Sequence, residues 1–141
     1  MSLLVVQDLG KSFGGVKAVD GISFALDKGE LLALIGPNGA GKSTTFNMVN
    51  GQLKADRGSI RLAGQELVGR KPRDIWKLGV GRTFQIAETF ESLSVVENVQ
   101  MALLSGDGLI YSMWRRAASH RRADALALLD QVGMLAQADR P

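Results

Sequence analysis

The spacing of apolar and polar positions predicts three strands in the first 35 residues. Residues 3–9 are rich in Leu and Val, and residues 21–26 alternate in the manner of a half-buried strand. Residues 11–15, which lie between them and end in Gly-Gly, predict a loop. Residues 31–35 are apolar without alternation, which is typical of a central strand buried on both faces. The turn residues at 27–30, Asp-Lys-Gly-Glu, predict a hairpin between the second and third strands.

Residues 36–41 interrupt this pattern with three glycines and a proline, and a helix is expected directly after them. Positions 42–49 suit that helix, and Asn50-Gly51 is a typical helix end. The same rules predict four further short elements: strands at 58–63 and 65–68, a helix at 73–78 with Pro72 near its start, and a strand at 79–85.

From residue 94 onward the pattern is helical. Ser94 and Glu97 fit a capping box, in which the hydroxyl and the carboxylate each bind one amide at the helix end. A helix is therefore expected over about 95–104. Apolar positions at helical spacing then predict a second helix over about 119–132, which stops at Gly133.

The composition is that of one globular domain with a mildly basic surface. The chain has 141 residues, of which 45% are hydrophobic and 22% are charged, so it is long enough to bury a core. Its net charge is +3 and its pI is about 9.5. Basic residues cluster only at Arg115-Arg116 and His120-Arg121-Arg122. We interpret these as a solvated helix face, and contact with an anionic partner stays open.

The chain contains no cysteine, which excludes disulfides and thiolate metal sites and is compatible with a reducing cytoplasm. Its first residues carry no basic segment, and Asp8 interrupts their apolar run, so we expect no signal peptide. The longest apolar stretch, residues 31–35, is far too short to cross a membrane. Any membrane association is therefore expected to go through a partner.

The strongest signal for function is the segment Gly-Pro-Asn-Gly-Ala-Gly-Lys-Ser at 36–43, which fits the phosphate-loop pattern G-x-x-x-x-G-K-[ST]. Its glycines allow consecutive N–H groups to point into one concavity, and the helix that follows adds its positive end. Lys42 is expected to reach the β- and γ-phosphates, and Ser43 to bind Mg²⁺. The sequence therefore predicts binding of a nucleoside triphosphate, with Mg-ATP as the expected ligand.

Two further motifs accompany the loop: Phe13 in Lys-Ser-Phe-Gly-Gly, and Gln85 in Gly-Arg-Thr-Phe-Gln. Together with the loop, they resemble the ATP-binding subunits of ABC transporters over essentially the whole chain. The stretch 79–85 and the helical tail are similar to the ATPase subunits of branched-chain amino acid importers, although importers of other polar solutes share much of this pattern. The resemblance implies an α/β fold: a P-loop NTPase core with an antiparallel β subdomain at 1–91, and part of a helical subdomain at 92–141.

The resemblance also implies roles for single residues. Phe13 matches the aromatic residue that stacks on adenine, and Gln85 matches the glutamine that contacts Mg²⁺ or the attacking water and senses the transmembrane partner. Thr44 and Thr45 are expected to bond α-phosphate oxygens. The expected nucleotide contacts are Phe13, Gly36, Pro37, Asn38, Gly39, Ala40, Gly41, Lys42, Ser43, Thr44 and Thr45, with Ser43 and Gln85 at the metal and with Lys42 and Gln85 in catalysis.

Hydrolysis in this family uses further residues: a Ser-Gly-rich signature motif, an Asp that ends an apolar strand, a following Glu and a switch histidine. Residues 86–141 contain none of them in the expected pattern. Residues 104–108 lack the final Gly-Gln of the signature motif, and His120 lies too early to be the switch histidine. We therefore expect the chain to be the N-terminal part of a longer subunit, and to bind ATP without turning it over alone.

The resemblance implies that the full subunit is an ATP hydrolase at the cytoplasmic face of the cell membrane. It is expected to pair with a second ATPase subunit and to contact transmembrane permease subunits. The alternative hypothesis is a soluble P-loop ATPase that acts on nucleic acid, which the pI and the two arginine pairs favour. The motif around Gln85 and the modest net charge favour the transporter subunit, so no direct nucleic-acid contact is expected.

Overall fold

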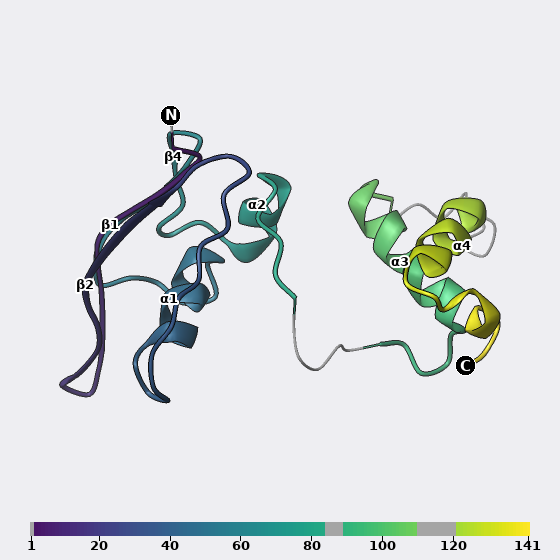
Figure 1. The fold of residues 1–141 in the computed structure, drawn as a ribbon, viewed down its shortest axis with the longest axis horizontal. Helices are drawn as coiled ribbons and strands as arrows, with labels where there is room; N and C mark the ends of the chain where they lie inside the picture. Colours follow the sequence, from purple (N-terminus) through teal and green to yellow (C-terminus); the bar gives the residue numbers. More distant parts are fainter. Residues whose placement is uncertain (1, 84–88, 110–120) are drawn as a thin grey trace. The chain divides into compact units, whose positions relative to one another are not determined.

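A computed structural model of the chain describes residues 2–83, 89–109 and 121–141 (Figure 1). The chain divides into two compact units, Met1–Thr83 and Phe84–Pro141. The first unit contains β1 (Leu4–Phe13), β2 (Val16–Leu26), α1 (Lys42–Val49), β3 (Arg57–Leu62), β4 (Gln65–Glu66) and α2 (Pro72–Lys77). The second contains α3 (Val95–Gly106), α4 (Arg122–Gln131) and the 3-10 helix η2 (Leu135–Gln137).

The first unit is built on a four-stranded sheet in the order β2-β1-β3-β4, with antiparallel neighbours throughout. β1 and β2 form a long hairpin whose turn is Gly14-Gly15, with φ of 52° and 85°. Two successive positive φ angles are what a type I′ turn requires, and its twist matches that of the paired strands. Glycine adopts these angles without steric cost, so the Gly-Gly pair places the turn.

The strands predicted at 3–9 and 21–26 are confirmed, and both are longer than predicted. The loop predicted at 11–15 is wrong, because residues 11–13 stay paired with β2 up to the Phe13–Val16 pair at the turn. The later short strands are confirmed at β3 and β4, and the short helix at α2. The helix predicted at 42–49 has those bounds in α1.

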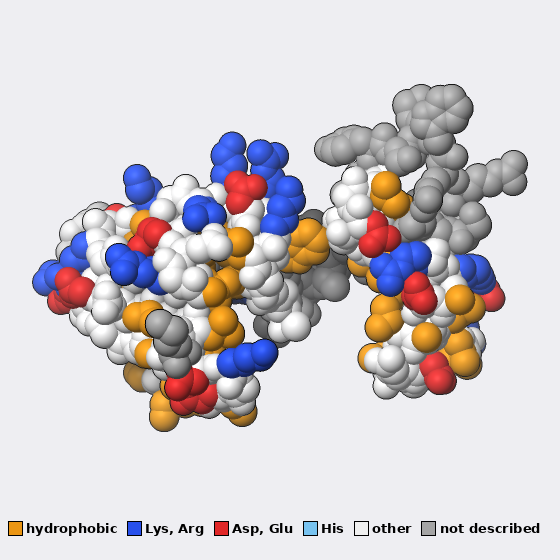
Figure 2. All heavy atoms as spheres, turned by 90° about the horizontal axis from the view of Figure 1, so that it is seen from above, with side chains coloured by type: hydrophobic (Ala, Val, Ile, Leu, Met, Phe, Trp, Pro, Cys, Tyr) orange, Lys and Arg blue, Asp and Glu red, His pale blue; other side chains and the backbone are white. Residues whose placement is uncertain are grey.

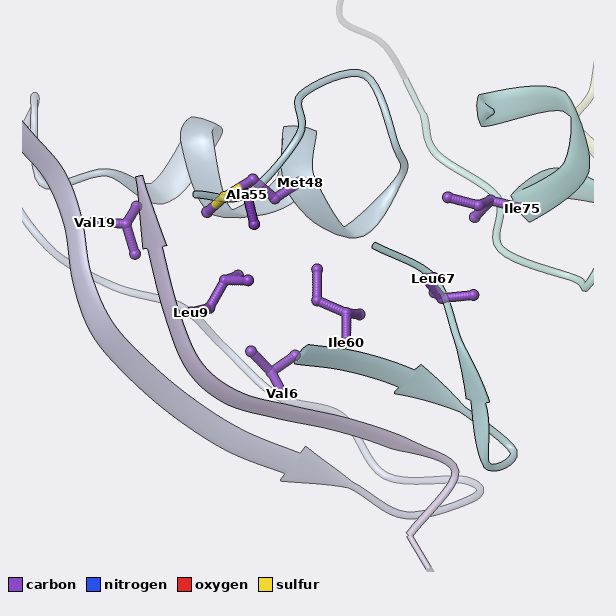
Figure 3. Close-up of a cluster of buried hydrophobic side chains, with 8 residues drawn as sticks. All are labelled: Val6, Leu9, Val19, Met48, Ala55, Ile60, Leu67 and Ile75. Carbon is purple, nitrogen blue, oxygen red and sulfur yellow. The ribbon is translucent and has the colours of Figure 1, made fainter. Parts of the chain in front are cut away.

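One face of the sheet packs against α1 through a single apolar cluster (Figure 3). Leu9, Ile60 and Leu67 have no exposed surface, and Met48 of α1 is 2% exposed. Each such side chain contributes about 1.5–3 kcal/mol through burial. The buried members of the cluster are Val6, Leu9, Val19, Met48, Ala55, Ile60, Leu67 and Ile75. This packing fixes where α1 begins relative to β2.

The prediction of a central strand at 31–35 is wrong. These residues form no strand, and Leu31 and Ile35 are 96% and 88% exposed. A strand exists only where its N–H and C=O groups bond to a neighbour, and no described segment pairs with this one. The turn at 27–30 does form, with Glu30 N–H donating to Asp27 O at 3.2 Å. The hairpin predicted around it does not, because its second strand is missing.

The strand predicted at 79–85 is also absent over 79–83, and its last two residues lie outside the described residues. The reason is the same, since none of the described strands pairs with 79–83.

The second unit is helical, as predicted, and the capping box at Ser94 is confirmed. Ser94 Oγ accepts from Glu97 N at 3.4 Å, and Glu97 Oε2 accepts from Ser94 N at 2.8 Å. The amides of Val95 and Val96 donate to Arg140 O and Ala138 O, both at 2.8 Å. The first-turn amides of α3 are thus all hydrogen-bonded within the unit.

The two predicted helices of this unit are confirmed with small shifts. α3 extends to Gly106, two residues beyond its predicted end. α4 begins at Arg122, and the first residues of its predicted range, 119–120, lie outside the described residues. Val132 is the C-cap of α4, and Gly133 follows with φ of 71°, as its predicted stop requires. The two helices pack through a cluster of Val96, Ala125, Leu129 and Ala138.

The β3–β4 connection depends on one carboxylate. Glu66 Oε1 accepts from Ile60 N at 3.0 Å, Leu67 N at 3.2 Å and Val68 N at 3.0 Å. Burial raises the pKa of this carboxyl, but the hydrogen bonds from the three amides outweigh it, so the pKa of Glu66 lies below its ordinary value. A depressed pKa means that the ionised carboxylate stabilises the folded chain.

We predict that Glu66→Gln lowers the free energy of unfolding at neutral pH by up to about 1 kcal/mol, because a neutral amide oxygen accepts more weakly than a carboxylate. Solvent screens part of the effect, since the side chain is 42% exposed. The stabilisation from Glu66 is present above its unfolded pKa and is lost as pH falls through its folded pKa, so the two proteins should converge in acid. Urea unfolding from pH 7 to pH 3 measures this, with Glu91→Gln as the charge-matched control. A difference that is constant with pH would contradict it.

Candidate functional site

The glycine-rich segment 36–41 forms a tight loop that leads directly into α1 (Figure 1). Gly36, Gly39 and Gly41 all have positive φ, at 155°, 84° and 80°. Ala40 N–H donates to Pro37 O at 3.2 Å, which closes a turn in the middle of the loop. Three backbone positions that favour glycine therefore fall on the three glycines of the predicted phosphate-loop pattern.

Gly41 is the point at which the loop contacts the sheet. A Cβ atom at this position would lie 2.2 Å from Ala18 O and 3.0 Å from Val19 Cγ2, both on β2. A Cβ at Gly39, by contrast, would meet no heavy atom within 4 Å. Gly41 thus allows the backbone of the loop to approach the backbone of β2, and α1 begins directly at that contact.

Lys42 places its ammonium group inside the loop. Its Nζ donates to Gly36 O and to Pro37 O, both at 2.6 Å. The lysine is the first residue of α1, whereas its two acceptors lie five and six residues earlier. The Lys42 side chain therefore reaches back across the loop, and its charge is held at the carbonyls of the loop's first two residues.

The amides at the start of α1 are free to bind a ligand. Gly41 is the N-cap and provides no side-chain hydrogen bond. Thr45 N–H donates to Gly41 O at 2.8 Å, but within the described part of the chain the N–H groups of Lys42, Ser43 and Thr44 have no acceptor. The corresponding amides of α3 are all bonded. Free amides beside an ammonium group at a helix N-terminus are suited to bind an anion.

The three hydroxyl side chains after Lys42 have different surroundings. Ser43 is exposed and Thr44 is half-buried, both in the first turn of α1. Thr45 is 2% exposed, and its Oγ1 donates to Gly41 O at 3.0 Å, so its hydroxyl hydrogen bonds inside the helix. Ser43 and Thr44 are thus the hydroxyls that a ligand at the loop would reach.

Ser43 also fits the role of a magnesium ligand. Mg²⁺ is commonly held by one or two protein oxygens together with phosphate oxygens and water. A single exposed hydroxyl beside the anion-binding amides meets this requirement. Among the residues that the structure describes, no group of three or more His, Cys, Asp or Glu side chains is arranged to hold a metal. A Mg²⁺ ion held by the Ser43 hydroxyl would take its remaining ligands from phosphate oxygens and water.

Phe13 lies at the end of β1, beside the Gly14-Gly15 turn, and is 49% exposed. It pairs with Val16, two residues before Ala18, the residue that Gly41 contacts. The aromatic side chain and the wall of the phosphate loop therefore belong to the same hairpin. The ammonium group of Lys11 lies 5.6 Å from the centroid of the Phe13 ring. This neighbour could not be predicted from the sequence, because a lysine in an expected loop carries no signal of its own.

Gln85, the other predicted catalytic residue, lies outside the described residues. Arg82, three positions before it, was not singled out from the sequence. Its guanidinium donates to Asn47 Oδ1 at 2.5 Å and to Gln52 Oε1 at 3.2 Å. These two hydrogen bonds connect the segment before Gln85 to the C-terminal half of α1 and the residues after it. Arg82 and Phe46 both line a hollow of about 420 Å³.

The arginines that favoured nucleic acid are already paired with acids where the structure describes them. Arg121 binds Asp124 at 2.7 Å and Asp107 at 3.2 Å, and Arg122 binds Asp139 at 2.6 Å. Arg115-Arg116 and His120 lie outside the described residues. On the face drawn in Figure 2, Lys and Arg side chains lie beside Asp and Glu side chains on both units. Where the chain is described, no helix has the length and apolar character of a membrane span.

We predict that Gly41→Ala is more damaging than Gly39→Ala, although both glycines have positive φ. At Gly39 the only cost is the strain of holding alanine in the left-handed conformation, which lowers stability by about 1–2 kcal/mol. At Gly41 the new Cβ also meets Ala18 O, which costs about 1–3 kcal/mol more. Thermal and urea unfolding of the two variants measure the difference. Equal losses would show that the contact with β2 does not constrain the loop.

Comparison with known proteins places this site in a family. Residues 19–141 match the ABC transporter family. The chain is 39% identical over 145 residues to the high-affinity branched-chain amino acid transport ATP-binding protein LivG of Salmonella typhimurium, covering 98% of this chain and 57% of that protein. It is 34% identical over 119 residues to the probable LivG protein of Methanocaldococcus jannaschii, covering 81% of this chain and 46% of that protein.

A solved structure gives the same answer for the fold. The chain is similar to an ATP-binding cassette of an ABC transporter in its ADP conformation, with a TM-score of 0.81 and 30% identity, covering 99% of this chain and 57% of that one. The fold class predicted from the sequence, an α/β P-loop NTPase with an antiparallel sheet and helices, is thereby confirmed. The chain spans about half the length of the curated relatives described above. Because the family match covers most of its residues, this chain belongs to the ABC transporter ATP-binding family.

Proposed function

We propose that this chain binds Mg-ATP at the phosphate loop, as the N-terminal portion of the energy-coupling ATPase subunit of an importer. The observation that carries the proposal is the start of α1. There the amides of Lys42, Ser43 and Thr44 have no acceptor in the described chain, and the Lys42 ammonium group is bonded only to the carbonyls of Gly36 and Pro37 in the same loop. Phosphate oxygens supply the acceptors and the negative charge that this arrangement lacks.

The proposed roles follow from position along the loop. The amides from Asn38 to Thr44 cradle the phosphates, and Lys42 moves its bonds from Gly36 O and Pro37 O to the β- and γ-phosphates. The exposed hydroxyl of Ser43 binds Mg²⁺. Thr44 rather than Thr45 binds the α-phosphate, because Thr45 is buried and its hydroxyl donates to Gly41 O. Phe13 stacks on the adenine, since it is half exposed on the hairpin that backs the loop.

Turnover is proposed to need residues that this chain does not provide. Gln85 would contact Mg²⁺ or the attacking water, but phosphoryl transfer also uses a carboxylate for the metal and further groups at the γ-phosphate. Residues 86–141 contain neither the signature motif nor an acidic motif at the end of an apolar strand. We therefore propose that the 141-residue chain binds ATP and does not hydrolyse it at a useful rate.

The transport assignment is proposed from relatives. The LivG proteins are named for branched-chain amino acid transport. Another relative, XylG of Sulfolobus acidocaldarius, is named for xylose and arabinose import and is 40% identical to this chain over 100 residues. We propose that the full subunit serves an importer of a small polar solute, and branched-chain amino acids are the solute that we favour. Its partners would be permease subunits and a second ATPase subunit at the cytoplasmic face of the membrane. The ion pairs of Arg121 and Arg122 argue against the nucleic-acid alternative, because both arginines already bind acids.

We predict that the chain binds Mg-ATP and inorganic triphosphate, and that Lys42→Ala weakens both by at least about tenfold, since a charge-assisted contact to phosphate is worth about 1.5–3 kcal/mol. Isothermal titration of both proteins measures this. Phosphate release from the same sample should stay at background. Lys28→Ala removes the same charge from the turn at 27–30 and serves as the control.

Two results would count against these proposals. If Lys42→Ala and Lys28→Ala bind triphosphate as well as the unmodified chain, the phosphates do not contact Lys42. If the purified chain releases phosphate at a steady rate that Lys42→Ala abolishes, the residues needed for turnover are present in this chain after all.

We predict that Phe13→Ala weakens Mg-ATP binding by about tenfold and leaves triphosphate binding unchanged, because stacking on a base is worth about 1–3 kcal/mol. Phe13→Tyr keeps the aromatic face and should bind ATP like the unmodified chain. Titrations of the three proteins with both ligands test this. An ATP affinity that is the same in Phe13→Ala and Phe13→Tyr would show that the ring does not contact the base.

A further inference from the structure

We propose that Lys11, held by Asp56, is a positioning residue that fixes the Phe13 ring for the nucleotide base. This inference rests on the proposed function, because it concerns how the same site takes ATP. Neither Lys11 nor Asp56 belongs to the phosphate loop, and Asp56 lies 45 positions after Lys11 in the sequence. The two meet because β3 pairs with β1.

Asp56 holds the end of β1 through both carboxylate oxygens. Oδ1 lies 2.6 Å from Lys11 Nζ, and Oδ2 accepts from Ser12 N at 2.8 Å. The amide of Asp56 donates to Gly10 O at 2.9 Å. One residue therefore binds each of the three residues that precede Phe13. The hydrogen bond to Lys11 and then that from Ser12 lower the pKa of the Asp56 carboxyl, so it is ionised at neutral pH.

Lys11 is directed toward the ring by this pair. Its side chain is only 15% exposed, although it carries a charge. Its ammonium group lies 5.6 Å from the Phe13 centroid, within the range of a cation–π interaction. About half of the Phe13 side chain stays exposed, so the ring keeps surface for a second partner. A ring that contacts a cation on one side and a base on the other loses less freedom when the base binds.

The turn side of Phe13 offers no comparable support. The next two residues are Gly14 and Gly15, which have no side chains, and a Cβ at either would meet no heavy atom within 4 Å. Val16, the residue paired with Phe13, is 70% exposed. Lys11 is thus the neighbour that links the ring to Asp56, the residue just before β3. Lys17 also lies on this hairpin, but it is paired with Asp20 at 3.1 Å.

The test measures Mg-ATP and Mg-triphosphate affinities by isothermal titration in five variants of the 141-residue chain: Lys11→Met, Lys11→Arg, Asp56→Asn, Phe13→Ala and the double variant Lys11→Met/Phe13→Ala. We expect Lys11→Met and Asp56→Asn to weaken ATP about two- to fivefold, the size of a cation–π contact, and to leave triphosphate unchanged. Lys11→Arg keeps the cation and should stay close to the unmodified chain. In the Phe13→Ala background, Lys11→Met should have no further effect on ATP.

Each other result would overturn the inference in a distinct way. Equal loss of ATP and triphosphate affinity in Lys11→Met would mean that Lys11 does not act through the ring, because either a phosphate contact or a general folding defect gives that result. A further loss in the double variant would mean that Lys11 acts without the ring, and unchanged ATP affinity would mean that it has no role. A general folding defect would lower the affinity for both ligands, whereas a displaced Phe13 ring would lower only the affinity for ATP. The triphosphate affinity therefore distinguishes the two. If the unmodified chain fails to bind triphosphate, the proposed function itself is wrong; if triphosphate binds and Phe13→Ala has no effect on ATP, only the base contact is wrong.

Discussion

The contact between Gly41 and β2 is the constraint on which the candidate site depends. The loop must turn into a helix at a point where its backbone lies against Ala18 O, and no side chain larger than hydrogen fits there. Burial of Met48 against Leu9 and Ile60 holds α1 on the sheet from its other end. With both ends fixed, the first turn of α1 has one position. The amides of Lys42 to Thr44 are then aligned before any ligand arrives, which reduces the entropy that binding costs.

Local chemistry could be predicted from the sequence wherever it depends on neighbours in the chain. The capping box at Ser94, the stop at Gly133 and the bounds of α1 depend on contacts within a few residues, and all were predicted correctly. The phosphate loop belongs to the same class, because its shape follows from glycines at fixed spacing. The fold class was implied by the resemblance to ABC transporter ATP-binding subunits, and the solved structures confirm it.

The errors concern strand pairing and contacts between distant segments. Residues 31–35 have the composition of a buried strand, but a strand depends on partners that the composition does not supply, and Leu31 is 96% exposed. The loop predicted at 11–15 is paired instead, because β1 continues to the Gly-Gly turn. Lys11 and Asp56 could not be connected from the sequence, since 45 positions separate them and neither stands in a motif. Gln85 lies outside the described residues, so its role stays a prediction.

The two well-formed helix starts show why one serves as a site and the other does not. Both α1 and α3 present backbone amides that their own helix leaves unbonded. At α3 the sequence supplies Ser94 and Glu97, and the carbonyl groups of Ala138 and Arg140 bind the remaining amides. At α1 the N-cap is a glycine with no hydrogen-bonding side chain, and the first side chain is a cation rather than an acceptor. A glycine cap followed by lysine leaves the first amides without a side-chain acceptor and places a positive charge at the positive end of the helix, which is unfavourable for the helix alone. Both features become favourable once an anion binds, so the unbonded amides and the cation at the start of α1 support the proposed phosphate ligand.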